Sequence, residues 1–216
     1  MMGCARSAER GAFVVVVGPD GSGKTTLARA LVAASPTPVC YFHFRPALRG
    51  PLADRPPDAP AVPAAKTPCQ RPGDRIRGWL RLVRSAGHCV LAYWLKIRPA
   101  TRRGKLVFGD RWIFGYLTQP APLRYYGPEW LARVIIRLVP EPSITVNLTA
   151  PVPVLLARKR ELTADELAAE LAANRTLPVT RLVNLSSEQP PAALATQLLK
   201  TLAAFDFNSD RHDTAR

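Results

Sequence analysis

The chain has 216 residues, and 47% of them are hydrophobic. This is enough for one α/β domain with a sizeable core, and it excludes wholesale disorder. The formal net charge is +14, from 30 Lys and Arg against 16 Asp and Glu. Because the arginines are scattered and not interleaved with aromatic residues, the charge favours a basic site for anionic small molecules over a nucleic-acid interface, while peripheral association with anionic lipid stays open.

No apolar run in the sequence approaches the length of a membrane span, and the longest covers only residues 12–17. Residues 1–11 are expected to form a flexible N-terminus. A cleaved signal peptide is not expected, because cleavage after the apolar run would destroy the glycine loop that follows it. Four widely spaced cysteines lack a C-x-x-C pair, so reduced cytoplasmic thiols are expected instead of zinc ligands: Cys4, Cys40, Cys69 and Cys89.

A glycine-rich loop lies between a predicted strand and a predicted helix near the start of the chain. Residues 12–17 form an apolar β-branched run typical of a buried strand, and residues 25–34 predict a helix. Between them, Gly18 to Thr26 has the sequence GPDGSGKTT, which satisfies the Walker A pattern G-x-x-x-x-G-K-[ST]. This context favours a phosphate-binding loop over a chance match.

The chemistry of such a loop follows from its residue types. Glycines allow backbone N–H groups to turn inward around phosphate oxygens, and the helix start adds the positive end of its dipole. Lys24 is expected to reach the β- and γ-phosphates of ATP, and the Thr25 hydroxyl to hold Mg²⁺. The residues expected to bind the nucleotide are Gly18, Asp20, Gly21, Ser22, Gly23, Lys24, Thr25 and Thr26.

The next part of the chain combines a strand, a proline-rich segment and a long helix. Residues 38–44 predict a strand, residues 46–72 an irregular surface insertion, and residues 74–98 a helix. An apolar stripe on this helix is expected to pack into the core; it contains Ile76, Trp79, Leu80, Val83, Val90, Leu91 and Trp94. The opposite, basic side is interpreted as solvated in preference to lining a phosphate site; it contains Arg77, Arg81, Arg84 and His88.

The second half of the chain continues the alternation of strands and helices. Strands are predicted at residues 105–111, 143–148 and 178–185, helices at 128–138, from 153 to 158 and at 191–205, and an irregular segment at 115–124. The pattern predicts an α/β protein with a three-layer α/β/α P-loop NTPase fold and a parallel sheet of about five strands. The domain is expected to cover residues 12–205, followed by a flexible tail at 206–216, with ligands at the carboxyl ends of the strands.

Two neighbouring residues at the end of one predicted strand carry chemistry. Asp110 is expected beside the glycine loop, where a carboxylate holds Mg²⁺ through water. An ordinary strand-end acid is the weaker alternative. Arg111 is expected to clamp a phosphate through its guanidinium, and the alternative is a structural pair with an acid such as Glu141.

A basic segment after the fourth strand predicts a helical lid over residues 158–175. Arg158, Lys159 and Arg160 stand together, and Thr163 with Glu166 forms a capping-box pattern at the start of a polar helix. Lids supply positive charge to a phosphoryl group in transfer, so Arg158 and Arg160 are candidate catalytic residues. A solvated charged face is the alternative.

These motifs together resemble the thymidylate kinase family of nucleoside-monophosphate kinases, over about residues 12–205. Two further segments, RYYGPEWLA from Arg124 and LLARKREL from Leu155, are similar to bacterial thymidylate kinase-like proteins. The resemblance implies that Asp20 contacts the acceptor sugar, that Asp110 and Arg111 serve magnesium and the acceptor phosphate, and that Arg158, with Arg160 as second, stabilises the transferred phosphoryl. It also implies a homodimer.

The chain departs from the family pattern where the acceptor is expected to bind. Gly115 stands where an acid is expected, and Gln119-Pro120-Ala121-Pro122 replaces Asp-Pro-Arg-Arg. Arg45-Pro46 matches only part of an Arg-Glu-Pro-Gly segment. In spite of these departures, the resemblance as a whole implies a cytoplasmic, ATP- and Mg²⁺-dependent kinase that acts on a nucleoside monophosphate, with dTMP preferred. The alternatives are a kinase for another small acceptor, such as a nucleoside or a sugar intermediate, and a non-catalytic nucleotide-binding module with a basic partner surface.

Overall fold

The computed structural model describes residues 11–44, 48, 51–54, 56, 73–158 and 162–205. The predicted N-terminal segment, most of the proline-rich insertion and the predicted tail lie outside them. The strands are β1 (Phe13–Val17), β2 (Val39–His43), β3 (Leu106–Asp110), β4 (Ile144–Thr149) and β5 (Leu182–Ser186). The helices are α1 (Lys24–Ala34), α2 (Asp74–Ala92), the π-helical turn η1 (Tyr93–Ile97), α3 (Arg98–Arg102), α4 (Gly115–Thr118), α5 (Glu129–Arg137), α6 (Val152–Arg158), α7 (Ala164–Arg175) and α8 (Pro191–Ala204).

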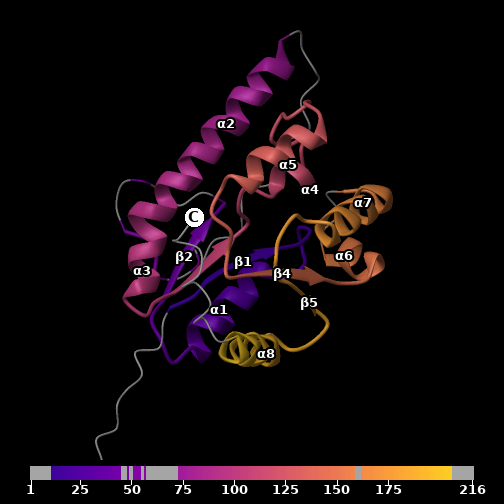
Figure 1. The fold of residues 1–216 in the computed structure, drawn as a ribbon. Coiled ribbons are helices and arrows are strands. Elements are labelled where there is room, and N and C mark those ends of the chain that lie inside the picture. Colours follow the sequence, from indigo (N-terminus) through magenta and orange to yellow (C-terminus); the bar gives the residue numbers. More distant parts are fainter. Residues whose placement is uncertain are drawn as a thin grey trace, which may run out of the picture.

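The five strands form one parallel sheet in the order β2-β3-β1-β4-β5. Helices lie on both faces of the sheet, with α1 and α8 on one side and α2, η1 and α5 on the other (Figure 1). Because all five strands are parallel, their carboxyl ends lie at the same edge of the sheet, and the crossover connections return the chain to the opposite edge. The prediction of an α/β fold with a parallel sheet of this size is confirmed.

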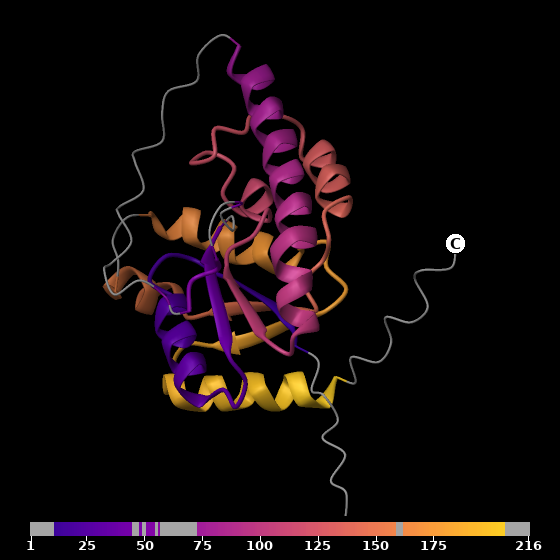
Figure 2. The same ribbon diagram turned by 90° about the vertical axis from the view of Figure 1, so that its left-hand side faces the viewer.

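The core consists of two apolar layers that share strand β1. All of β1 is buried, and successive side chains point to opposite faces of the sheet. Phe13, Val15 and Val17 pack with α2, η1 and α5, while Val14 and Val16 pack with α1 and α8. Figure 2 shows α8 at the far side of the sheet from α2. The run of β-branched residues in β1 therefore reflects burial on both faces.

Helix α2 presents a different face to the core than the sequence predicted. Its buried face consists of Gly78, Leu82, Ser85, Ala86, Cys89 and Ala92, together with Asp74. Small residues let the helix approach its neighbours closely: a Cβ at Gly78 would lie 2.9 Å from the Arg124 carbonyl oxygen. The predicted apolar stripe faces outward instead, apart from the half-buried Val90. The prediction that this stripe packs into the core is wrong.

Several boundaries also differ from the predictions. The helix expected over residues 74–98 passes through η1 and continues as α3 to Arg102. The segment 115–124, expected to be irregular, begins with the short helix α4. The last strand starts at Leu182, later than the predicted residue 178. The side chains of Cys40 and Cys89 are buried.

No helix within the described part of the chain is both long enough and apolar enough to cross a lipid bilayer. The long helix α2 combines its apolar residues with arginines, and other helices are shorter. A helix that crosses a bilayer needs about 20 mostly apolar residues. This agrees with the absence of a spanning run in the sequence.

Candidate functional site

The glycine loop connects the carboxyl end of β1 to the start of α1. Gly18 has a φ of +150°, and a Cβ there would lie 2.4 Å from the Leu148 carbonyl oxygen on β4. Gly23, with a φ of +89°, precedes the helix, faces open space and provides no side-chain cap. The first amides of α1 therefore lack a capping side chain, which is the arrangement that accepts an anion.

Lys24 is buried and folded back onto the loop. Its Nζ donates to the carbonyl oxygens of Gly18 at 2.9 Å and Pro19 at 2.7 Å, and it lies 3.7 Å from Asp20 Oδ1. Burial lowers the pKa of Lys24, and the nearby Asp110 carboxylate offsets part of this effect. The ammonium thus donates to two neutral carbonyls at the base of the loop, with one carboxylate nearby, and phosphate oxygens could take the place of the carbonyls.

Asp110 ends β3 directly beside the loop, since it pairs in register with Val16 of β1 and His43 of β2. Its Oδ2 lies 3.3 Å from His43 Nδ1 and accepts a hydrogen bond from the Tyr41 hydroxyl at 3.3 Å. Burial alone raises the pKa of Asp110, but the contact with His43 and the charge of Lys24 outweigh burial and lower it. Burial raises the pKa of Tyr41, and the charge of the Asp110 carboxylate and its hydrogen bond with Tyr41 raise it further.

The other carboxylate oxygen of Asp110 is buried and has no hydrogen-bond partner within the described part of the chain. A buried, ionised oxygen without a partner is costly unless a cation or a donor reaches it. The Ser22 hydroxyl in the loop is likewise buried and unpartnered. Both orphaned atoms lie in the segments that the sequence assigned to phosphate and magnesium.

Arg111 links the glycine loop to the segment after β3. Its φ of +66° places a non-glycine residue in the left-handed region, and its backbone N–H donates to Val16 O at 2.9 Å. One guanidinium nitrogen donates to Asp20 Oδ1, and the other to Gln119 Oε1. The alternative of a structural pair with an acid is therefore present, but the acid is Asp20, while Glu141 accepts hydrogen bonds from Thr180.

Two buried polar residues on α7 join this cluster, and the sequence analysis missed them. Glu170 and Asn174 are nearly inaccessible, and Glu170 Oε2 and both amide atoms of Asn174 have no hydrogen-bond partner among the described residues. Burial raises the pKa of Glu170, while a hydrogen bond with Gln119 and the charge of Arg111 lower it in part. A signal existed: Leu167, Glu170 and Asn174 share one helix face, which places polar side chains on the buried side.

Gly115 lies close to the turn that follows α4. A Cβ at Gly115 would lie 3.2 Å from Leu123 Cδ1, so a larger side chain there would require the Leu123 side chain to shift slightly. The carboxylate near Gln119 comes from α7 instead, through Glu170. Ala121 and Pro122 lie in the same turn-rich segment and contribute no charge.

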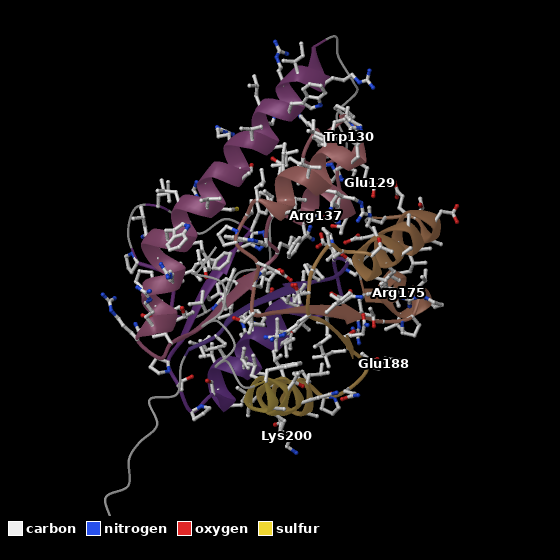
Figure 3. The ribbon with its side chains drawn as sticks, viewed as in Figure 1. Glu129, Trp130, Arg137, Arg175, Glu188 and Lys200 are labelled. Carbon is white, nitrogen blue, oxygen red and sulfur yellow. The ribbon has the colours of Figure 1, made fainter. Side chains whose placement is uncertain are left out.

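A cavity of about 470 Å³ opens beside the loop, lined by Gly21, Ser22, Gly23 and Thr26, by Arg158 of α6, and by the segment from Ser187 to Pro191. Arg158 donates to Ser187 Oγ at 3.1 Å and to Ser187 O at 3.3 Å, which holds it across the cavity from α1. Figure 3 labels Glu188 on this segment, between β5 and α8. The volume suits a nucleoside-sized ligand.

The prediction of a capping box at the start of a polar helix is confirmed, and the assignment of residues 158–175 to a lid stays a prediction. Helix α7 begins with a complete capping box, in which Thr163 and Glu166 exchange side-chain and backbone hydrogen bonds. Arg160, with Lys159 and Glu161, lies outside the described residues, as does Arg45-Pro46. Of the predicted cations, Lys24, Arg111 and Arg158 are therefore the ones that the structure brings to the carboxyl edge of the sheet.

In the described ranges no three His, Cys, Asp or Glu side chains gather as metal ligands. A magnesium ion at this edge would therefore draw its oxygens from the Thr25 hydroxyl, from Asp110 and from a bound ligand, which suits an ion that keeps several waters. Thr25 lies half-buried in the first turn of α1. Neither a protein-family model nor a curated protein matches this sequence.

Proposed function

We propose that the protein is an ATP- and Mg²⁺-dependent phosphotransferase with a P-loop NTPase fold. The observation that carries the proposal is the buried Asp110 oxygen that has no hydrogen-bond partner among the described residues, next to a glycine loop whose lysine donates to two backbone carbonyls and lies 3.7 Å from the Asp20 carboxylate. An anion in the loop and a hydrated cation on Asp110 would satisfy both groups at once. We expect the protein to act in the cytoplasm.

The residues of the site divide into two halves in this proposal. In the donor half, the loop amides and Lys24 bind the β- and γ-phosphates, and the cavity beside Arg158 receives the nucleoside. Thr25 and Asp110 would hold Mg²⁺, which supplies positive charge to the phosphates. Arg158, with Arg160 as a second candidate, places a guanidinium near the transferred group and helps exclude water.

The acceptor half is centred on Arg111. Its guanidinium would bind an acceptor phosphate, and Asp20 would accept a hydrogen bond from an acceptor hydroxyl. This arrangement suits a phosphorylated small molecule with a sugar. A nucleoside monophosphate is the proposed class, and dTMP is the first compound to test because of the resemblance to thymidylate kinases.

Glu170, Asn174 and Gln119 favour a second candidate, a kinase of the same type with a different acceptor. Gln119 accepts a hydrogen bond from Arg111 and contacts Glu170, and the buried Asn174 lies one turn further along the same face of α7 as Glu170. This set differs from the charged pattern that the resemblance led us to expect. An acceptor such as a nucleoside or a sugar intermediate would use them as hydrogen-bond partners. Mass spectrometry of products from a mixed acceptor panel separates the two candidates.

The test is ATP consumption by the purified chain with Mg²⁺ and a panel of nucleotides, nucleosides and sugar phosphates. Lys24→Met should weaken ATP binding about 10- to 100-fold, because a charge-assisted hydrogen bond contributes roughly 1.5–3 kcal/mol. Asp110→Asn should lose turnover more than ATP affinity, because it acts through the cation. Lys200→Met, at an exposed position of α8, is the matched control and should change neither ATP binding nor turnover.

Two outcomes would contradict the proposal. One is the absence of phosphotransfer across the panel, although Lys24→Met still lowers ATP binding. That result would favour a non-catalytic nucleotide-binding module, and salt-sensitive binding of a nucleic acid or protein partner would then test its basic surface. The other is ATP binding that Lys24→Met leaves unchanged, which would remove the glycine loop from the site.

A further inference from the structure

An apolar row runs along the outer face of α2 and η1. It consists of Ile76, Leu80, Val83, Leu91, Trp94 and Leu95, each between 46% and 65% exposed. The spacing of three and four residues keeps the row on one side of α2, and Gly87 falls within it. The wider π-helical turn buries Ile97 and leaves Trp94 and Leu95 outside. At 1.5 Å per residue the row is about 28 Å long.

A basic row borders this outer apolar row on one side. Arg77, Arg81, Arg84 and His88 each follow a position of the apolar row by one residue, which places them about 100° around the helix. Arg77 and Arg84 are exposed, and Arg98 stacks on Trp94 with its guanidinium 4.2 Å from the ring centroid. The only acid between residues 74 and 102 is Asp74, which is buried.

This combination decides which partner fits the face. A second copy of the chain, packed antiparallel on α2 across a two-fold axis, would bring the same flank of both helices together, so the two basic rows would face each other. In a parallel packing the basic row would face the other flank of α2, and neither flank has an exposed acid to pair with it, which is unfavourable. The segment 57–72 that precedes α2 has Val62 as its one large aliphatic residue, so it offers little apolar surface.

An anionic lipid surface matches both rows at once. Apolar side chains and Trp enter the boundary between headgroups and acyl chains, while arginines extend to lipid phosphates. Each basic residue near such a surface adds affinity by charge attraction. Nucleic acid would satisfy the arginines alone and leave the apolar row in water.

We propose that the outer face of α2 and η1 binds the surface of an anionic membrane, with the helix axis parallel to the bilayer. In Figure 2 the helix lies toward the viewer, on the opposite side of the sheet from α8, so the membrane would cover this side of the molecule. The protein is then a peripheral membrane protein. This inference does not depend on the proposed function, since none of these residues belongs to the site at the carboxyl edge of the sheet.

The first experiment measures flotation of the full-length protein with vesicles of phosphatidylglycerol and phosphatidylcholine, and with vesicles of phosphatidylcholine alone. Binding is expected to the anionic vesicles only and to weaken with salt. The double variants L80Q/L91Q and R77E/R84E should each bind at least about 25-fold more weakly, near five-fold per residue. Lys200→Glu carries one charge reversal on α8, away from α2 (Figure 3), and should stay within about two-fold of wild type.

The second experiment tests whether the row itself enters the lipid. In W79F/W130F the remaining indoles are Trp94 in the outer apolar row and Trp112, which is 1% exposed in the core. Lipids brominated on the acyl chain should quench the emission of Trp94, and Trp94→Phe in the same background should abolish the quenching. Circular dichroism of each variant confirms that it folds.

Three outcomes would overturn the inference. Wild-type protein that does not float with anionic vesicles would do so directly. A loss of binding per reversed charge that is as large in Lys200→Glu as in R77E/R84E would show that net charge acts without this face. A concentration-dependent dimer in sedimentation that L80Q/L91Q converts to monomer would assign the face to a second copy.

Discussion

Gly109 in β3 tests how the sheet holds the candidate magnesium ligand that follows it. A Cβ at Gly109 would lie 2.5 Å from Phe42 Cζ and 3.0 Å from Phe42 Cε2. Phe42 is the buried residue opposite Gly109 on β2, so its ring has little room to move. Overpacking a close-packed core costs about 1–3 kcal/mol. Gly109→Ala should therefore lower the free energy of unfolding by about 2 kcal/mol.

The cause can be isolated with a double-mutant cycle. Phe42→Leu removes the ring edge that meets the added methyl group and alone should cost about 1 kcal/mol. In the double variant the methyl group occupies the vacated space, so the loss should be about 1 kcal/mol smaller than the sum of the single losses. Urea unfolding followed by far-UV circular dichroism measures all four proteins.

The control for the same substitution elsewhere is Gly87→Ala. Gly87 lies in α2 and nothing lies within 4 Å of its added Cβ, so alanine should stabilise the protein by about 0.5–1 kcal/mol. Strictly additive losses in the cycle would refute the steric explanation for Gly109. So would a Gly109→Ala protein as stable as the wild type.

Substitutions at three other positions follow from the site. Arg111→Gly and Arg111→Ala remove the same guanidinium, but the φ of +66° favours glycine. The glycine variant should therefore be more stable than the alanine variant by about 0.5–1 kcal/mol in urea unfolding. The opposite order of stability would contradict strain at this position. Gly18→Ala should cost at least about 2 kcal/mol, because its Cβ would lie 2.4 Å from Leu148 O, and loss of ATP affinity in titration calorimetry should accompany it. Burial raises the pKa of Glu170, so wild-type stability should fall as pH rises from the usual carboxyl pKa through the raised one. Glu170→Gln should be more stable than wild type above that window and lose the advantage below it, and a stability difference independent of pH would show that Glu170 does not titrate there.

The sequence predicted the parallel sheet, and the position of Asp110 beside the glycine loop, for a clear physical reason. Strands buried on both faces are continuous apolar runs, as in β1. A Walker A pattern between a strand and a helix predicts a phosphate-binding loop. Asp110 was found because a charged residue at the end of such a strand must lie at the common carboxyl edge. These inferences depend only on local sequence and on parallel topology.

The errors arose where packing depends on partners far away in the chain. The periodicity of α2 predicted an amphipathic helix, but it could not show that the inward face is the one with Gly78, Ala86 and Cys89. That choice depends on how closely the 124–126 segment approaches. Likewise, Glu170 meets Gln119 only through the docking of α7 on α4, which no local pattern encodes.

For the proposed kinase, the contacts of the three cations at the carboxyl edge of the sheet restrict which phosphoryl acceptors can bind well. Lys24 and Arg158 donate to carbonyl and hydroxyl oxygens, which phosphate oxygens can replace with stronger charge-assisted bonds, and the Asp20 carboxylate lies 3.7 Å from Lys24. Arg111 is different, because its guanidinium donates directly to that carboxylate. An acceptor phosphate that merely displaces Asp20 exchanges one anion for another and leaves a carboxylate short of a donor, so it gains little. An acceptor that binds well must therefore bring an anion for Arg111 together with a hydroxyl or amine for Asp20, and a phosphorylated sugar meets both requirements.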